Sequence, residues 1–252
     1  LVASKESFEG YAAADMQLAP VPEGDLDDIP HVAQGNTNER KYKMDEEAQQ
    51  KVLRGYYASI TYMDSQVGRL LDALDNHGLT DNTIVVFASD HGYHLGEHTM
   101  WQKKSLMEES IRVPLIVSVP GQQRTDTQCN RLVELLDIYP TLAEAVGLEP
   151  PDDIQGQSFA ALLDNPDAAH ARQDTLTQVR DGFCLRTEKW AYMRYDTGKN
   201  KVPETMLYNM ETDPKQVTNL SGNPDYAAIE KELRERLDAR VAAAKSIRGN
   251  AS

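Results

Sequence analysis

Two continuous runs of β-prone apolar residues constrain the fold of this chain most. The first spans residues 83–88, and the second spans 113–119 and ends at Pro120-Gly121. A strand without a polar face needs cover on both sides, as strands of parallel sheets have. We therefore predict that both runs are buried strands of a mostly parallel sheet.

Helical patterns lie on either side of these runs. Asp45 is a suitable N-cap for a long helix that ends near Asn76, and Gly78 is a natural stop after it. A second helix is expected over 132–146, and the alternation of helices and strands favours an α/β layered architecture. The first helix carries one apolar stripe of more than four turns, whose aromatic members we expect in the core and not in contact with a ligand: Leu53, Tyr56, Tyr57, Ile60, Met63, Val67, Leu70, Leu71 and Leu74.

The character of the chain changes after Pro150-Pro151. Three short strands and a final amphipathic helix are expected at 183–187, 190–195, 206–209 and 226–245. Glu188-Lys189 would join the first two strands as a hairpin. We therefore divide the chain into an α/β part, 1–150, with an irregular acidic lead-in over 1–44, and a small antiparallel sheet with a helix, 151–252.

Composition excludes several classes of function. The net charge of −14 argues against nucleic acid, whose phosphates require a positively charged surface. No apolar run approaches the roughly 18 residues that a spanning helix needs, so no membrane span is expected. Cys129 and Cys184 are too few for a disulfide framework. The chain opens at Leu1 without an initiator Met or a signal-peptide pattern, and we interpret it as a fragment or a processed product.

The densest group of reactive side chains follows the first apolar run. Asp90 offers a carboxylate oxygen and His91 an imidazole nitrogen, just beyond the carboxyl end of a strand, where ligands collect in α/β sheets. Gly92 and Gly96 permit turns that bring both side chains toward a bound ion. A loop with a satisfied aspartate and surface histidines is an equally weighted alternative.

Other polar residues near this loop carry weaker signals. His94 and His98 are four residues apart, but Glu97 is misplaced for the H-E-x-x-H pattern, so surface or supporting roles are favoured. Lys103 and Lys104 place two cations near an anion site, although a solvated surface role is the commoner one for a lysine.

Five sequence blocks, in order, resemble the sulfatase family, most closely its iduronate-2-sulfatase-like branch. The blocks cover 55–71, 83–103, 108–117, 137–142 and 207–220. The resemblance implies the C-terminal portion of an alkaline-phosphatase-like α/β sandwich with a mostly parallel sheet. A small antiparallel C-terminal subdomain with a terminal helix would follow.

The same resemblance assigns roles to individual residues. Asp90 and His91 fall where sulfatases hold a divalent cation, usually calcium, although many family members have Asn at the position of His91 and nitrogen is a less typical calcium ligand. Lys103 matches the catalytic lysine that points at the sulfate group, and Lys104 replaces it if the loop register differs by one. His98 is a supporting candidate in substrate binding.

The nucleophile of the family is not found among these residues. Sulfatases use a formylglycine made from the Cys or Ser of a C/S-x-P-x-R motif, which neither Cys129 nor Cys184 fits. Ser118-Val119-Pro120 begins correctly but lacks the arginine. We therefore expect the formylglycine in an N-terminal sulfatase segment that acts as a partner, and we expect this chain alone to be inactive.

The resemblance also implies a substrate and a location. The substrate would be a sulfated small molecule or sulfated saccharide, and the location periplasmic, secreted or lysosome-like. A phosphodiesterase or phosphonate monoester hydrolase of the same superfamily is one alternative, which the nucleophile motif would distinguish. A non-catalytic binding module is the other, favoured by robust folding without metal affinity. The identity of the substrate and the oligomeric state are not determined by the sequence.

Overall fold

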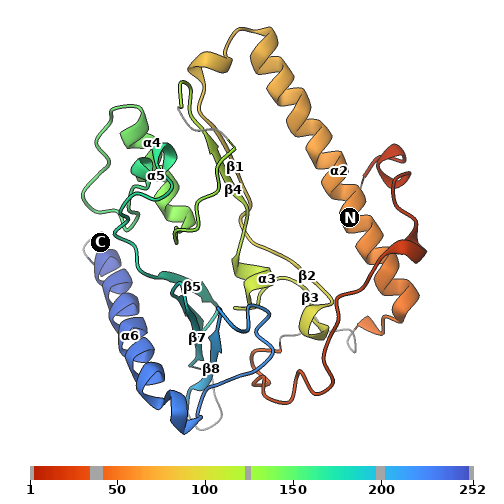
Figure 1. Cartoon of the computed structure of the whole chain (residues 1–252), viewed down its shortest axis with the longest axis vertical. Helices are drawn as coiled ribbons and strands as arrows, with labels where there is room; N and C mark the ends of the chain where they lie inside the picture. The colour runs from red at the N-terminus through yellow and green to blue at the C-terminus, as the bar shows by residue number, and fades with distance from the viewer. Residues whose placement is uncertain (1–2, 35–41, 123–125, 197–201, 250–252) are drawn as a thin grey trace.

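The computed structural model describes residues 3–34, 42–122, 126–196 and 202–249. Its helices are α2 (Glu46–Asn76), α3 (Glu108–Ile111), α4 (Ile138–Ala145), α5 (Ala160–Asp164) and α6 (Ala227–Gly249). Its strands are β1 (Val85–Ala88), β2 (His94–Leu95), β3 (Trp101–Gln102), β4 (Leu115–Ser118), β5 (Thr175–Val179), β6 (Gly182–Arg186), β7 (Trp190–Tyr195) and β8 (Glu204–Asn209). In Figure 1 the pair β1–β4 lies between α2 on one side and the β5–β8 sheet with α6 on the other. No described helix combines the length and the apolar character that crossing a membrane requires.

The long helix α2 begins and ends where its sequence signals predict. The Asp45 side chain accepts a hydrogen bond from the Ala48 N–H at 2.9 Å, as an N-cap does. Gly78 follows the last turn with a φ of +64°, the left-handed conformation that ends helices. The predicted boundaries of this helix are confirmed.

The apolar stripe of α2 is only partly covered. Leu53 is buried, but several members farther along are exposed, and Leu70 is 65% exposed. The N-terminal segment packs on the first turns of the helix, where Arg54 donates to the Tyr11 carbonyl at 2.6 Å and Tyr11 stacks on Tyr57. The expectation that the aromatic members belong to the core is therefore wrong for Tyr57, which is 40% exposed, whereas Tyr56 is half-buried.

The two apolar runs form strands as predicted, but they pair antiparallel. Val85 lies opposite Ser118, and Ala88 lies opposite Leu115. The connecting segment contains the hairpin β2–β3 and the short helix α3 instead of a crossover helix, so the chain returns in the opposite direction. The expectation of parallel pairing is wrong for these two strands.

The C-terminal sheet is antiparallel throughout, in the order β5-β6-β7-β8. The predicted hairpin is confirmed, with Cys184 opposite Met193. Alternate residues point to opposite faces of a strand, and both faces of this sheet are covered. On one face, Phe183, Leu185, Tyr192 and Leu207 of the sheet pack against Leu233 and Leu237 of α6.

The other face of this sheet supports the segment that carries the candidate site. Met100, Leu106 and Met107 share a buried cluster with residues of the sheet, among them Met193 and Tyr208. The cluster thus joins residues from both predicted parts of the chain, 1–150 and 151–252, and that division stays a prediction.

Candidate functional site

The imidazole of His91 makes two contacts that fix its protonation. Its Nε2 lies 2.5 Å from the Lys103 ammonium, and its Nδ1 lies 2.8 Å from the Gly92 carbonyl oxygen. An ammonium can only donate, so Nε2 accepts and Nδ1 carries the proton that it donates to Gly92. An Nδ1–H bonded to a backbone carbonyl is the usual arrangement of a metal-binding histidine. A cation at Nε2 would compete with Lys103 for the same lone pair.

Asp90 completes the group. Its side chain is 86% exposed, and its Oδ2 lies 3.6 Å from His91 Nε2. The structure thus brings together Asp90, His91 and Lys103, at the end of β1 and directly after β3. A carboxylate and a neutral imidazole fit as two ligands of a divalent cation, whereas calcium takes six to eight. No cluster of three or more His, Cys, Asp or Glu residues suited to a metal occurs among the residues that the structure describes.

Backbone contacts hold this loop against α3. The Ser89 hydroxyl donates to the His91 carbonyl at 2.8 Å, and the Gly92 N–H donates to the Ser110 carbonyl at 2.8 Å. A Cβ atom at Gly92 would lie 2.0 Å from the Glu109 carbonyl oxygen. Only glycine fits at this position, because a side chain would push the loop away from α3.

The backbone around Lys103 is strained. His98, Thr99, Gln102 and Lys104 all have φ between +52° and +83°. A left-handed conformation costs a non-glycine residue about 1–2 kcal/mol, and such residues cluster at functional sites. The buried ring of Trp101 and the pairing of β2 with β3 hold the segment in place. Lys104 is exposed, and the contact with His91 is made by Lys103.

His94 and His98 are buried, so of the two predicted roles, surface or supporting, the surface role is wrong. They are 1% and 4% exposed, because the hairpin β2–β3 turns them inward. His94 Nε2 lies 2.9 Å from the Ser105 hydroxyl, and His98 Nδ1 lies 3.0 Å from Asp25 Oδ2. Asp25 is itself buried, although the acidic lead-in was predicted to be an irregular surface excursion. A role for His98 in substrate binding stays a prediction.

His94 is expected to make the protein sensitive to acid. Burial, and secondarily the neighbouring His98, lowers the pKa of His94 from 6.5 to about 4. Between pH 6.5 and about 4, His94 is protonated in the unfolded chain but neutral in the folded chain. Protons therefore favour the unfolded state, so the stability that is complete above pH 6.5 is lost as the pH falls toward 4. The loss amounts to at most roughly 3 kcal/mol.

The measurement is urea unfolding at pH 7, 5.5 and 4.5 of the parent chain and the His94→Gln variant. We expect a clearly smaller change of unfolding free energy with pH in the variant. His77→Gln, at an exposed position after α2, is the control and should behave like the parent. An unchanged pH dependence in His94→Gln would contradict the assignment.

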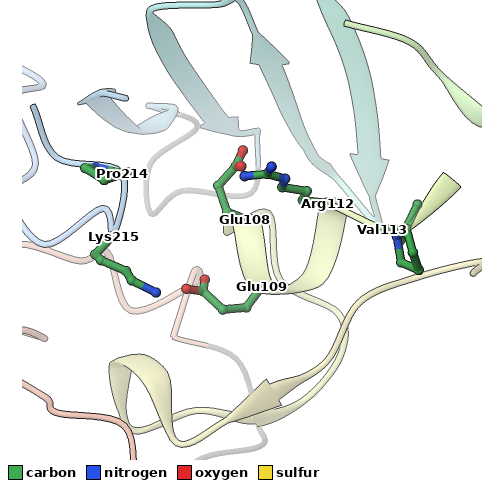
Figure 2. Close-up of a pocket in the computed structure, with 7 residues that line it drawn as sticks. Glu108, Glu109, Arg112, Val113, Pro214 and Lys215 are labelled. Atoms are coloured by element: carbon green, nitrogen blue, oxygen red, sulfur yellow. The ribbon is translucent and has the colours of Figure 1, made fainter. Parts of the chain in front are cut away.

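A separate pocket of about 500 Å³ lies beside α3 (Figure 2). Figure 2 shows the Lys215 ammonium and the Glu109 carboxylate pointing toward each other across it. Burial raises the pKa of Glu109, and Glu108 is paired with Arg186 at 3.0 Å. The lining comprises Glu108, Glu109, Arg112, Val113, Pro114, Pro214 and Lys215. It does not include Asp90, His91 or Lys103, so this pocket is not the predicted site.

Comparison with known proteins identifies the family. The family described as N-sulphoglucosamine sulphohydrolase, C-terminal, matches residues 96–243, and the sulfatase family matches residues 29–148. The chain belongs to the sulfatase family. The predicted resemblance and the alkaline-phosphatase-like fold class are confirmed.

Curated sulfatases are longer than this chain. An N-acetylglucosamine-6-O-sulfatase of Bacteroides thetaiotaomicron is 31% identical over 75% of this chain and 35% of its own length. Human iduronate 2-sulfatase is 34% identical over 63% of this chain and 36% of its own length. The chain therefore spans little more than a third of these relatives.

Solved structures that resemble this chain are also longer than it. BT4656 in complex with its substrate D-glucosamine-2-N,6-O-disulfate matches with a TM-score of 0.72 and 30% identity, over 84% of this chain and 45% of that one. The phosphonate monoester hydrolase of Agrobacterium radiobacter matches with a TM-score of 0.80 over 95% of this chain and 53% of that one. Its identity of 23% shows the shared fold alone.

Proposed function

We propose that this sulfatase chain carries one edge of the metal and sulfate site of a sulfuric ester hydrolase. The contact between Lys103 and His91, 12 residues apart, is the observation that supports this most. It places a cationic side chain beside a neutral imidazole and the exposed carboxylate of Asp90. The group lies just beyond the end of β1 and directly after β3.

Each residue has a role in this proposal. Asp90 and His91 hold a divalent cation, with calcium as the first candidate. Lys103 donates to a sulfate oxygen, and it stabilises the negative charge that develops on the sulfate as its ester bond breaks. A local positive charge is needed because the chain as a whole carries a net charge of −14, which repels anions.

The nucleophile and the remaining ligands belong to an N-terminal sulfatase segment outside these 252 residues. That segment would supply the formylglycine, since no C/S-x-P-x-R motif occurs in this sequence. It would also cover the exposed apolar residues of α2, β4 and the end of α4, which include Leu70, Leu71, Ile116, Val146 and Leu148. We take these exposed apolar side chains as the surface that contacts that segment. The two-stranded pair β1–β4 also needs further cover to be stable in water.

A sulfated saccharide is the proposed substrate class, supported by the saccharide sulfatases among the relatives. The same proposal places the protein outside the cytoplasm, in a periplasmic, secreted or lysosome-like location, and this rests on the family alone.

Binding measurements on the chain test the proposed site. Calcium titration by calorimetry should give an affinity that Asp90→Asn lowers at least about tenfold, because one of the few charged ligands loses its charge. Lys103→Ala should weaken the binding of inorganic sulfate but preserve or increase calcium affinity, since the ammonium competes with a cation for His91. Lys104→Ala and Asp72→Asn, both at exposed positions, are the controls.

The purified chain is expected not to hydrolyse 4-nitrophenyl sulfate by itself. Hydrolysis by the chain alone would contradict the location of the nucleophile in another segment. Calcium affinity that is equal in the parent and in Asp90→Asn would contradict the metal site.

A further inference from the structure

Three tyrosines are linked to the neighbours of His91 and Lys103 in the chain. Tyr93 follows His91 by two residues, and its ring centroid lies 5.3 Å from that of Tyr56 on α2. The hydroxyl of Tyr42 accepts a hydrogen bond from Gln102, the neighbour of Lys103, at 3.0 Å. The three rings come from separate parts of the chain, so the fold itself assembles them.

These rings are held by contacts with neighbouring residues but remain partly exposed to solvent. Tyr56 and Tyr93 are half-buried, and Tyr42 is 39% exposed. Within the described residues, neither the Tyr56 ring nor the Tyr93 ring belongs to the two hydrophobic core clusters. A partly exposed aromatic ring with a polar edge is suited to recognise a ligand that is apolar on its face and polar on its rim.

The position of the rings defines which part of a substrate they can meet. Lys103 and a metal at Asp90 and His91 recognise the sulfate group whatever carries it. The group that carries the sulfate extends away from it, and Tyr93 and Gln102 are close in the chain to His91 and Lys103. A pyranose ring has C–H groups on its faces and hydroxyl groups at its edge, which matches these tyrosines. Polar groups that fix orientation beside an apolar wall are typical of small-molecule sites.

We infer that Tyr93, braced by Tyr56 and flanked by Tyr42, forms an aromatic wall that packs against the sugar ring bearing the sulfate. The wall selects a saccharide carrier over other sulfate esters, while Lys103 and the metal ligands act on the sulfate itself. This inference rests on the proposed function and adds to it the residues that determine specificity.

The test compares N-acetyl-D-glucosamine 6-sulfate with inorganic sulfate, using the full chain with calcium and titrations followed by NMR. We expect the sulfated sugar to bind at least about fivefold more tightly than sulfate, a gain of the size that aromatic contacts give. Tyr93→Leu should remove this preference without changing sulfate affinity, whereas Tyr93→Phe should keep it. Tyr139→Leu, on α4 and 57% exposed in the parent, should change neither affinity.

The outcomes separate the two proposals. If Lys103→Ala weakens sulfate binding but Tyr93→Leu leaves the sugar preference intact, the aromatic wall is wrong and the proposed site stands. Equal affinity of the parent for sugar and sulfate leads to the same conclusion. If neither ligand binds, or binding does not depend on Lys103, the proposed function fails and this inference fails with it.

Discussion

Replacing Arg172 by methionine is expected to lower the free energy of unfolding by about 3–5 kcal/mol. Its buried guanidinium forms a bidentate pair with Asp137, with Nε 2.7 Å from Oδ2, and its Nη1 lies 2.9 Å from Glu134 Oε2. Asp137 is fully buried, so the substitution leaves a carboxylate without its charged partner. The penalty for an uncompensated buried charge is larger than the net stabilisation that the intact pair provides.

The effect should reach the C-terminal sheet, because the network connects distant parts of the chain. Glu134 also accepts hydrogen bonds from Arg240 of α6 at 2.7 Å and from the Leu176 N–H of β5 at 2.6 Å. Asp137 accepts from the Gln157 N–H at 2.8 Å. The group therefore joins the start of α4 to β5 and α6.

Urea unfolding followed by circular dichroism measures this prediction. The control is Arg131→Met, which removes an exposed partner of Glu188 at 3.7 Å and should cost less than about 1 kcal/mol. Adding Asp137→Asn to Arg172→Met should recover part of the loss, because it removes the stranded charge. Equal destabilisation by Arg172→Met and Arg131→Met would show that the buried network does not behave as a unit.

Local signals explain which elements the sequence predicts well. The boundaries of α2 follow from Asp45 and Gly78, whose effects extend over one turn of helix. The hairpin β6–β7 follows from two β-prone segments separated by two residues. By contrast, β5 was missed because Thr175–Val179 is short and half polar, and its strand character depends on pairing with β6.

Non-local contacts explain what the sequence could not predict. The antiparallel pairing of β1 with β4 depends on the path of the 26 residues between them (89–114). Asp25 reaches His98 across 73 positions in the chain, and nothing in either local pattern indicates this contact. The apolar stripe of α2 was correctly identified, but its cover depends on other chain segments, which a periodicity does not specify.

The candidate site was also predicted only in part from the sequence. Asp90, His91 and Lys103 were predicted because they lie in contiguous blocks that resemble the family. Their mutual contact is what the structure adds. The residues around Lys103 have positive φ values, and tyrosines lie near it, only because the hairpin is folded. No sequence motif predicted either feature.

Replacing Gly92 by alanine is expected to weaken metal and sulfate binding strongly while destabilising the fold only moderately. The added Cβ would lie 2.0 Å from the carbonyl oxygen of Glu109, and a backbone atom cannot move aside as a side chain can. The loop must retreat from α3, which breaks the bond from the Gly92 N–H to Ser110. Overpacking of this kind costs about 1–3 kcal/mol.

The main effect of this substitution should be on ligand binding and not on the free energy of unfolding. The Gly92 carbonyl holds the proton of His91 Nδ1, so a shift at Gly92 reorients the ring that meets Lys103. Displacing a catalytic group by about 1 Å reduces activity on the order of a hundredfold. In the isolated chain, we expect the calcium affinity measured by calorimetry to fall at least about tenfold, the lower end of the losses seen when groups that orient metal ligands are removed.

Substitutions of two other glycines serve as controls that distinguish an effect on the Gly92 loop from a general effect of adding a methyl group. Gly156→Ala creates a comparable clash, 2.2 Å from the Leu136 carbonyl oxygen, so it should cost similar stability but leave calcium affinity unchanged. Gly68→Ala lies in α2 with nothing within 4 Å of its Cβ and should stabilise the chain by up to about 1 kcal/mol. If Gly92→Ala and Gly156→Ala both retain the calcium affinity of the parent, the contact of the loop with α3 does not position the metal ligands. If both lose it equally, the loss reports the stability of the fold and not the geometry of His91.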